Sequence, residues 1–146
     1  RHPFPREPRP DETTLIIVGH GTKQNANSRK AVEAQVNLIR ARGEYANVQP
    51  AFIEETPLIA DCYGTTQAKH IVVVPFFIAD GLHTVEDIPV LLGEPESRVR
   101  ELLRADQPTW RNPTERKGKL VWYTKAIGND LHLPEVILER VREAAQ

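Results

Sequence analysis

The segment His70–Ile78 reads HIVVVPFFI and is the strongest strand signal in the chain. Its apolar residues run almost without interruption, whereas a strand with one solvated face alternates apolar and polar residues. A strand that is buried on both faces is typical of a parallel sheet covered by helices on both sides. This segment therefore predicts the centre of a parallel α/β sheet.

Three more strands and several helices surround this central strand in the sequence. The other expected strands are Thr14–Val18, Val48–Ile53, whose Pro50 indicates an edge position, and Lys119–Thr124. Helices are expected from a cap at Asn27 and Ser28 to Gly43, from Thr56 to about Lys69, from Thr84 with Asp87 as its capping partner, over 96–104 and over 134–145. This alternation predicts a flavodoxin-like α/β fold: an open parallel sheet of four strands in the order 2-1-3-4, with helices on both faces.

The length of 146 residues fits a single domain, which we place at residues 13–146. Residues 1–12 contain four prolines, and we expect them to form an extended tail or linker. Because the sequence contains no methionine, even at position 1, we expect the chain to be processed, trimmed or cut from a longer one.

Composition argues against several classes of protein. A formal net charge of −1 does not suit an electrostatic nucleic-acid binder. No apolar run reaches the roughly 18 residues that a membrane span needs, and no signal segment is evident, so we expect a cytoplasmic protein. The single cysteine, Cys62, excludes an internal disulfide and a multi-cysteine zinc site.

Polar side chains follow the first three predicted strands at their carboxyl ends. His20 follows the first strand, Glu54 and Glu55 follow the second, and Asp80 and His83 follow the third. In an open parallel sheet, ligands bind at this edge, where the strand order reverses. Since the first and third strands are neighbours in the predicted order, we expect His20 and His83 to face one crevice, with a glutamate bordering it.

Two imidazoles and a carboxylate make a suitable site for a borderline divalent metal such as cobalt, nickel, iron or zinc. The set has too few ligands for a closed structural site. We therefore expect a metal that is handed on or that takes part in chemistry.

Other residues of these types have simpler interpretations. His70 lies at the amino end of its strand, His132 in a turn and His2 in the tail, and we interpret all three as structural. Cys62 is expected to be a small buried apolar group in a helix. The triplet GHG at 19–21 lacks the spacing of a phosphate-binding loop, which makes an FMN-binding flavodoxin a weaker alternative.

Four stretches of the chain resemble one known family. They are LIIVGHGT at 15–22, AFIEETP at 51–57, IVVVPFFIADGLHTVEDIP at 71–89 and AIGNDLHLPEVILERV at 126–141. Together they are similar to the class II, ATP-independent chelatases, which include sirohydrochlorin cobaltochelatases and ferrochelatases and the related nickel chelatases. The similarity covers residues 14–141 except the polar segment 106–119, and the third stretch is the most specific.

The resemblance implies a chelatase half-domain that inserts a divalent metal, cobalt or else iron or nickel, into sirohydrochlorin or a related tetrapyrrole. This lyase reaction needs no ATP and belongs to biosynthesis of the cobalamin and siroheme type. The metal is a substrate, and no nucleotide cofactor is expected. The family's metal-binding histidines match His20 and His83, and its site glutamate matches Glu54, with Glu55 as the alternative.

Substrate contacts and assembly are less closely specified by the sequence. Sirohydrochlorin carries eight carboxylates, so Lys23 and Arg29 are either its binding partners or solvated surface charges. Trp110 and Arg111 either stack on the ring or belong to a surface hairpin with a partly buried tryptophan. The resemblance implies a homodimer or one part of a longer two-domain chain. The alternative function is a non-catalytic tetrapyrrole or metal carrier, or one half of a fused chelatase.

Overall fold

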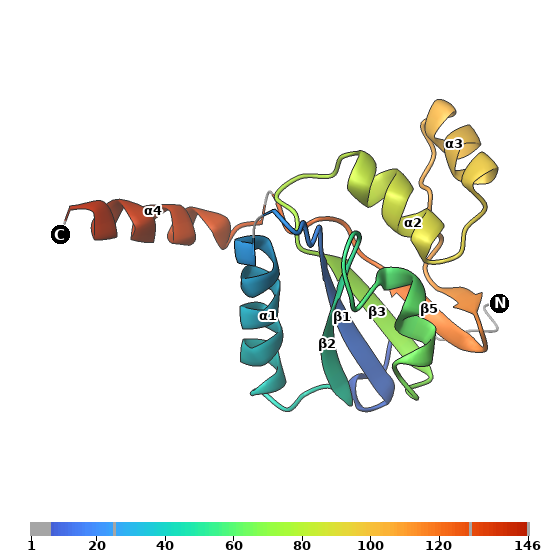
Figure 1. Ribbon diagram of the computed structural model, residues 1–146, viewed down its shortest axis with the longest axis horizontal. Helices are drawn as coiled ribbons and strands as arrows, with labels where there is room; N and C mark the ends of the chain where they lie inside the picture. Colours follow the sequence, from blue (N-terminus) through green and yellow to red (C-terminus); the bar gives the residue numbers. More distant parts are fainter. Residues whose placement is uncertain (1–6, 25, 129, 146) are drawn as a thin grey trace.

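The computed structural model describes residues 7–24, 26–128 and 130–145 (Figure 1). The strands are β1 (Thr13–Gly19), β2 (Asn47–Phe52), β3 (His70–Pro75), β4 (Thr114–Arg116) and β5 (Lys119–Tyr123), and the α-helices are α1 (Ala26–Arg40), α2 (Ile88–Leu91), α3 (Glu96–Arg104) and α4 (Leu133–Ala144). The described residues also include two 3-10 turns, at Pro10–Glu12 and Ile59–Gly64, and one π-helical turn at His83–Asp87.

The strands form one five-stranded sheet in the order β2-β1-β3-β5-β4. Strands β2, β1, β3 and β5 are parallel, which confirms the predicted order of the four parallel strands. The prediction of a purely parallel four-stranded sheet is wrong, because β4 adds an antiparallel strand at the β5 edge. β4 is polar and only three residues long, so its sequence shows no alternation of apolar and polar residues that would predict a strand. The hairpin turn between β4 and β5 consists of Lys117 and Gly118, both with positive φ.

β2 lies at the other edge of the sheet, as Pro50 predicted. A proline has no amide to donate, so it is tolerated where a strand has a neighbour on one side only. Pro50 lies opposite Ile17 in the register between β1 and β2.

One face of the sheet is covered by α1. The buried side chains between α1 and the sheet are Leu15, Ile17, Val32, Val36, Val48 and Phe52. The expected cap at Asn27 and Ser28 is wrong, since α1 already begins at Ala26, but Gly43 does end the helical region, with a positive φ of 67°.

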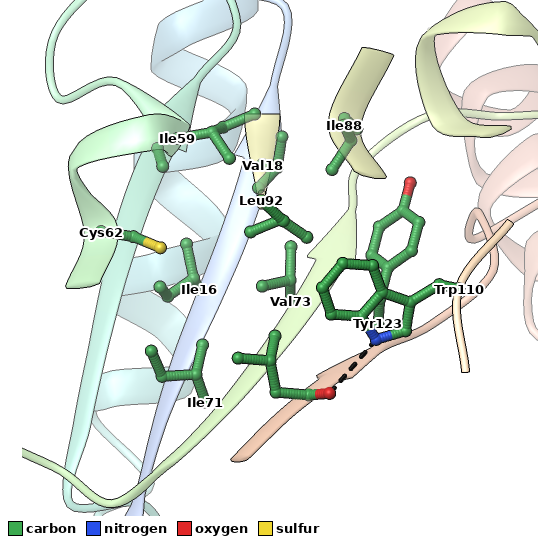
Figure 2. Close-up of a cluster of buried hydrophobic side chains, with 12 residues drawn as sticks. Ile16, Val18, Ile59, Cys62, Ile71, Val73, Ile88, Leu92, Trp110 and Tyr123 are labelled. Carbon is green, nitrogen blue, oxygen red and sulfur yellow. Dashed lines mark hydrogen bonds between the residues drawn. The ribbon is translucent and has the colours of Figure 1, made fainter. Parts of the chain in front are cut away.

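The opposite face carries the larger core cluster, part of which is shown in Figure 2. Ile59 and Cys62 reach this cluster from the 3-10 turn, and Ile88 comes from α2. Trp110 is buried here and donates from Nε1 to the Val121 carbonyl oxygen at 3.2 Å (Figure 2). Its indole is therefore a core group next to the β4–β5 hairpin and is not a free ring face.

Two predicted helices differ from the observed ones. The helix expected from Thr56 to about Lys69 is only the 3-10 turn Ile59–Gly64, which ends at glycine and is followed by two threonines, all weak helix formers. The helix expected at Thr84 begins with the π-helical turn His83–Asp87 and continues as α2. The helix expected over 96–104 is α3 with the same bounds.

The predicted tail lies partly outside the described residues, which exclude 1–6. Pro10–Glu12 form a 3-10 turn, so the expectation of an extended run is wrong there. Ala46 donates its backbone N–H to the Pro10 carbonyl oxygen at 3.0 Å, and the Arg9 N–H donates to His70 Nδ1 at 3.3 Å. This part of the chain is therefore held against the amino end of the sheet. The division into a tail and one domain over 13–146 stays a prediction.

None of the helices in the described ranges is both long and apolar enough to cross a bilayer.

Candidate active site

The two glycines beside His20 allow its loop to pack closely. A Cβ atom on Gly19 would lie 2.6 Å from Cγ2 of Val32, so only glycine lets α1 approach the end of β1. Gly21 has a φ of +71°, and a Cβ there would lie 2.6 Å from Cβ of Phe52. The GHG triplet thus bends the chain tightly and leaves His20 as its single side chain at the carboxyl edge of the sheet.

Backbone hydrogen bonds place Glu54 next to His20. The Glu54 N–H donates to the His20 carbonyl oxygen at 3.1 Å, and the Ile53 N–H donates to Gly19 at the same distance, so the pairing of β1 with β2 extends beyond both strands. Glu54 Oε1 lies 3.2 Å from His20 Nε2. The predicted pairing of a histidine and a glutamate from two loops is therefore present.

His83 reaches the same point from the segment after β3. The centroids of the His20 and His83 rings are 4.7 Å apart, with the rings tilted by 39°. We expected His83 to lie on a loop, but it is the first residue of the π-helical turn. The Ile88 N–H donates to the His83 carbonyl oxygen, and this five-residue spacing defines the π-helical turn. Tyr123 on β5 supports this turn by donating its hydroxyl to the Thr84 carbonyl oxygen at 2.5 Å.

Asp87 contacts a residue of the candidate site, although sequence reasoning gave it a different role. We expected Asp87 to be the capping partner of Thr84, but the Thr84 hydroxyl bonds to the backbone of Gly81 instead. One Asp87 carboxylate oxygen lies 2.7 Å from His83 Nδ1. The four-residue spacing between histidine and aspartate on a helical turn was the signal that could have identified this pair.

The Asp87 carboxylate fixes the tautomer of His83. A carboxylate only accepts hydrogen bonds, so neutral His83 carries its proton on Nδ1. The lone pair of Nε2 is then the ligand atom of this ring, and a carboxylate on the opposite nitrogen strengthens such a ligand.

The structure distinguishes the two adjacent glutamates. Glu54 contacts His20, whereas Glu55 Oε1 lies 3.6 Å from Nη1 of Arg29 and its side chain is only 19% exposed. Arg29 also donates to the Thr56 carbonyl oxygen at 2.6 Å. Glu55 and Arg29 thus join α1 to the loop after β2, and Glu54 is the glutamate beside His20.

Lys23 lies beside the histidine and glutamate pair, and Arg29 is engaged elsewhere. An open hollow of about 610 Å³ is lined by His20, Thr22, Lys23, Gln24 and Glu54. Lys23 is exposed there, so its ammonium group is available to an anionic ligand. The guanidinium of Arg29 is occupied by the Glu55 and Thr56 contacts and by Glu33, 3.3 Å away.

Asp80, the other acidic residue expected at this edge, accepts a hydrogen bond from the backbone N–H of Ala126 at 3.1 Å. It therefore joins the segment after β3 to the segment after β5. Within the described ranges, no three or more histidine, cysteine, aspartate or glutamate side chains are placed so that together they could hold a metal ion. The predicted ligands His20, His83 and Glu54 are neighbours through His20, which contacts Glu54 on one side and the His83 ring on the other, but they do not form a three-ligand metal site here.

The residues interpreted as structural lie away from this set. His70 is buried at the opposite end of β3, with its ring edge-on to Trp122. His132 is almost fully exposed and pairs with Asp130, whose pKa is lowered mainly by the hydrogen bond from the His132 backbone N–H. Burial raises the pKa of the Cys62 thiol to about 11, as expected of a small core residue. His2 lies outside the described residues.

Comparisons with a family model and with known proteins point to the same family. The CbiX family model matches residues 14–144. The chain is 38% identical to the "Probable sirohydrochlorin cobaltochelatase" of Halobacterium salinarum, over 95% of this chain and 45% of that protein. It is 30% identical to the sirohydrochlorin cobaltochelatase of Methanopyrus kandleri, over 89% of this chain and 95% of that protein. The chain thus spans less than half the length of the first relative.

Solved structures share the fold. A multi-domain protein of Deinococcus radiodurans with structural similarity to chelatases superposes with a TM-score of 0.74 at 22% identity, covering 90% of this chain and 28% of that one. The sirohydrochlorin chelatase SirB of Bacillus subtilis in complex with cobalt gives 0.61 at 22% identity, covering 90% of this chain and 50% of that one. With the family match over residues 14–144, this common fold confirms the resemblance carried by the four sequence stretches, and the chain belongs to the CbiX family of class II chelatases.

Proposed function

We propose that this chain inserts a divalent metal ion into sirohydrochlorin or a closely related tetrapyrrole, without ATP, in cobalamin or siroheme biosynthesis. Cobalt is the first choice of metal, since the relatives from Halobacterium and Methanopyrus are both named cobaltochelatases, and iron and nickel are the alternatives. The observation that carries the proposal is the pair of imidazole rings 4.7 Å apart, each with its own carboxylate partner.

Metal insertion requires a ligand that releases the ion again. His83 is suited to this task because Asp87 holds the proton on Nδ1 and leaves Nε2 as a ligand for cobalt, nickel or iron. The ring of His83 is also about half exposed, so a metal ion can reach it from solvent and leave toward a bound macrocycle.

The reaction also releases two pyrrole protons for each ion inserted. The His20–Glu54 pair can accept a proton at this point, because an imidazole exchanges protons near neutral pH and the adjacent carboxylate stabilises the imidazolium that forms. Both side chains can also contribute to the metal shell while the ion is being transferred. His20, His83 and Glu54 therefore carry the proposed catalysis, with Glu55 as a support for the loop.

The macrocycle would be positioned by its carboxylates. Lys23 is exposed beside His20 and is the proposed partner for a substrate carboxylate. Arg29 was proposed for the same role, and it would have to exchange its Glu55 and Thr56 contacts for the substrate. A cytoplasmic location agrees with this pathway and stays a prediction.

Anaerobic incubation of the purified chain with sirohydrochlorin and Co²⁺ tests this function through the absorbance change of the macrocycle. We expect many turnovers per chain, and we expect His20→Ala and His83→Ala each to lose about 100-fold or more in rate, the scale of acid–base participation. His70→Ala is the matched control, because the same substitution is made at the other end of the sheet, and it should retain turnover in the fraction that folds. Binding of one equivalent without turnover would instead support the carrier alternative.

A further inference from the structure

Two carbonyl groups of the π-helical turn that carries His83 lose their normal helical partners. In an α-helix the Thr84 carbonyl would accept from the Ile88 N–H, but that N–H donates to the His83 carbonyl oxygen instead. The N–H that a π-helical bond to Thr84 would use is missing, because Pro89 has none. The same proline deprives the Val85 carbonyl of its α-helical partner. Both carbonyls therefore need donors from elsewhere in the chain.

Two hydroxyl groups from other segments supply these donors. Tyr123, at the end of β5, donates to the Thr84 carbonyl oxygen at 2.5 Å. Thr109, which follows α3, donates to the Val85 carbonyl oxygen at 2.6 Å. Both donor residues are buried, with 8% exposure each. Burial raises the pKa of the Tyr123 hydroxyl, so this group keeps its proton and remains a donor in the neutral range.

The polar segment 106–119 fixes the two donors to each other. Asn112 Nδ2 donates to the Tyr123 carbonyl oxygen at 2.8 Å, and the Tyr123 N–H donates to Asn112 Oδ1 at 2.7 Å. The indole of Trp110 lies edge-on to the Tyr123 ring, with the ring centroids 6.3 Å apart (Figure 2). This segment lies outside the four stretches that resemble the chelatases, and these contacts place it against the turn that carries His83.

The π-helical winding decides where His83 lies. A π-helical bond encloses one more residue than an α-helical bond. Transfer of the Ile88 N–H from His83 to Thr84 would therefore rotate the preceding residues by roughly 100° about the helix axis, the angle of one residue in an α-helix. The His83 ring is now 4.7 Å from the His20 ring, and such a rotation would carry it away. The partner of one N–H thus controls the distance between the two histidines.

We propose that Tyr123 and Thr109 are positioning residues for metal insertion. The Tyr123 hydroxyl occupies the carbonyl that would otherwise draw the Ile88 N–H away from His83. The Thr109 hydroxyl anchors the neighbouring carbonyl and so resists rotation of the turn. Together they keep the ring of His83 beside that of His20. This inference deepens the proposed function and rests on it for its kinetic test alone.

The variant Tyr123→Phe removes the hydroxyl and keeps the ring, and NMR then reports where the Ile88 N–H bonds. In the unsubstituted chain, scalar coupling across the hydrogen bond should join the Ile88 nitrogen to the His83 carbonyl carbon. A nuclear Overhauser effect should also connect the two histidine rings. In Tyr123→Phe we expect the coupling to move to the Thr84 carbonyl carbon and the effect between the rings to be lost.

Tyr63 provides a matched control at the other end of the same helix. Its hydroxyl donates to the carbonyl oxygen of Leu92 at 2.6 Å, and Leu92 directly follows α2. Burial raises the pKa of this tyrosine as well. Tyr63→Phe therefore makes the same chemical change and should lower the melting temperature by a similar amount. It should leave the coupling to His83 in place and the insertion rate within about two-fold.

The cobalt insertion assay separates positioning from binding of the macrocycle. Tyr123→Phe should lower kcat by about 10-fold or more, the scale for groups that orient a metal ligand, with the KM for sirohydrochlorin within a few-fold. Thr109→Val should act in the same direction, whereas Thr109→Ser keeps a hydroxyl and should retain most of the rate. Thr114→Val is the control, because the Thr114 hydroxyl donates to the Arg111 carbonyl oxygen within the same segment.

A coupling that stays on His83 in Tyr123→Phe would overturn the proposal. An unchanged kcat in that variant, or an equal loss in Tyr63→Phe, would overturn it as well. Thermal unfolding checks that each variant folds, and Thr109→Val carries the test of the ring contact if Tyr123→Phe does not fold. An unsubstituted chain that inserts no metal would refute the proposed function instead, and the NMR measurements would still decide the role of Tyr123.

Discussion

Replacing Asp87 by alanine tests how the site prepares His83. The carboxylate lies 2.7 Å from Nδ1 of His83, and its loss removes the acceptor that keeps the proton on that nitrogen. Loss of a carboxylate that orients a metal-binding histidine typically costs about 10–100-fold in activity or metal affinity, which corresponds to roughly 1.4–2.7 kcal/mol. We expect this loss in kcat/KM for metal insertion, and a smaller one for Asp87→Asn, because an amide oxygen still accepts a hydrogen bond.

Stability should change little, since Asp87 is 39% exposed and an exposed pair contributes about 0–1 kcal/mol. Nitrogen NMR of histidine-labelled protein provides a measurement independent of activity. In the unsubstituted chain the neutral His83 ring should carry its proton on Nδ1, and in Asp87→Ala the proton should redistribute to Nε2. Glu86→Ala is the control, because Glu86 lies on the same helical turn but pairs with Arg100. An unchanged rate in Asp87→Ala despite a changed tautomer would refute this reasoning.

Three other outcomes are expected. Glu54→Gln should lower the insertion rate more than Glu55→Gln, because only Glu54 contacts His20; the reverse order in a steady-state assay would assign the role to Glu55. Gly21→Ala should destabilise the fold by about 1–3 kcal/mol in thermal unfolding, from its positive φ and the clash with Phe52. Gly43→Ala has the same sign of φ but no atom within 4 Å of the new Cβ, so it should cost only about 1 kcal/mol, and equal losses would contradict the clash. Burial raises the pKa of the Cys62 thiol to about 11, so below that pH the folded chain should resist thiol alkylation, and rapid alkylation at pH 8.5 without unfolding would contradict it.

The order of the parallel strands and the proximity of His20 and His83 were predictable from local sequence. The apolar run at 70–78 indicated a strand buried on both faces, and Pro50 indicated the edge. Once that order is given, parallel strands bring the ends of β1 and β3 together, so His20 and His83 had to meet. These features depend on burial and strand direction, which can be predicted from the type and spacing of the residues.

Other features depend on contacts between segments that are distant in the sequence, and residue type and spacing do not predict such contacts. The selection of Glu54 over Glu55 follows from the hydrogen bond between the Glu54 N–H and the His20 carbonyl, which sets the side of the chain on which each carboxylate lies. The pairing of Asp87 with His83 depends on a π-helical turn that Tyr123 supports from a remote strand.

Strand β4 and the position of α4 were likewise decided only by tertiary structure. A three-residue polar strand forms because β5 offers it an unpaired edge, and its own residues carry no alternation. The sequence predicted an amphipathic helix over 134–145, which the structure shows as α4 (Leu133–Ala144), but amphipathicity indicates only that an apolar face needs a partner. Which surface that face covers depends on contacts beyond the helix itself, and the structure fixes only the start of the segment after β5, where Ala126 and Ile127 are hydrogen-bonded to Asp80 and Phe77.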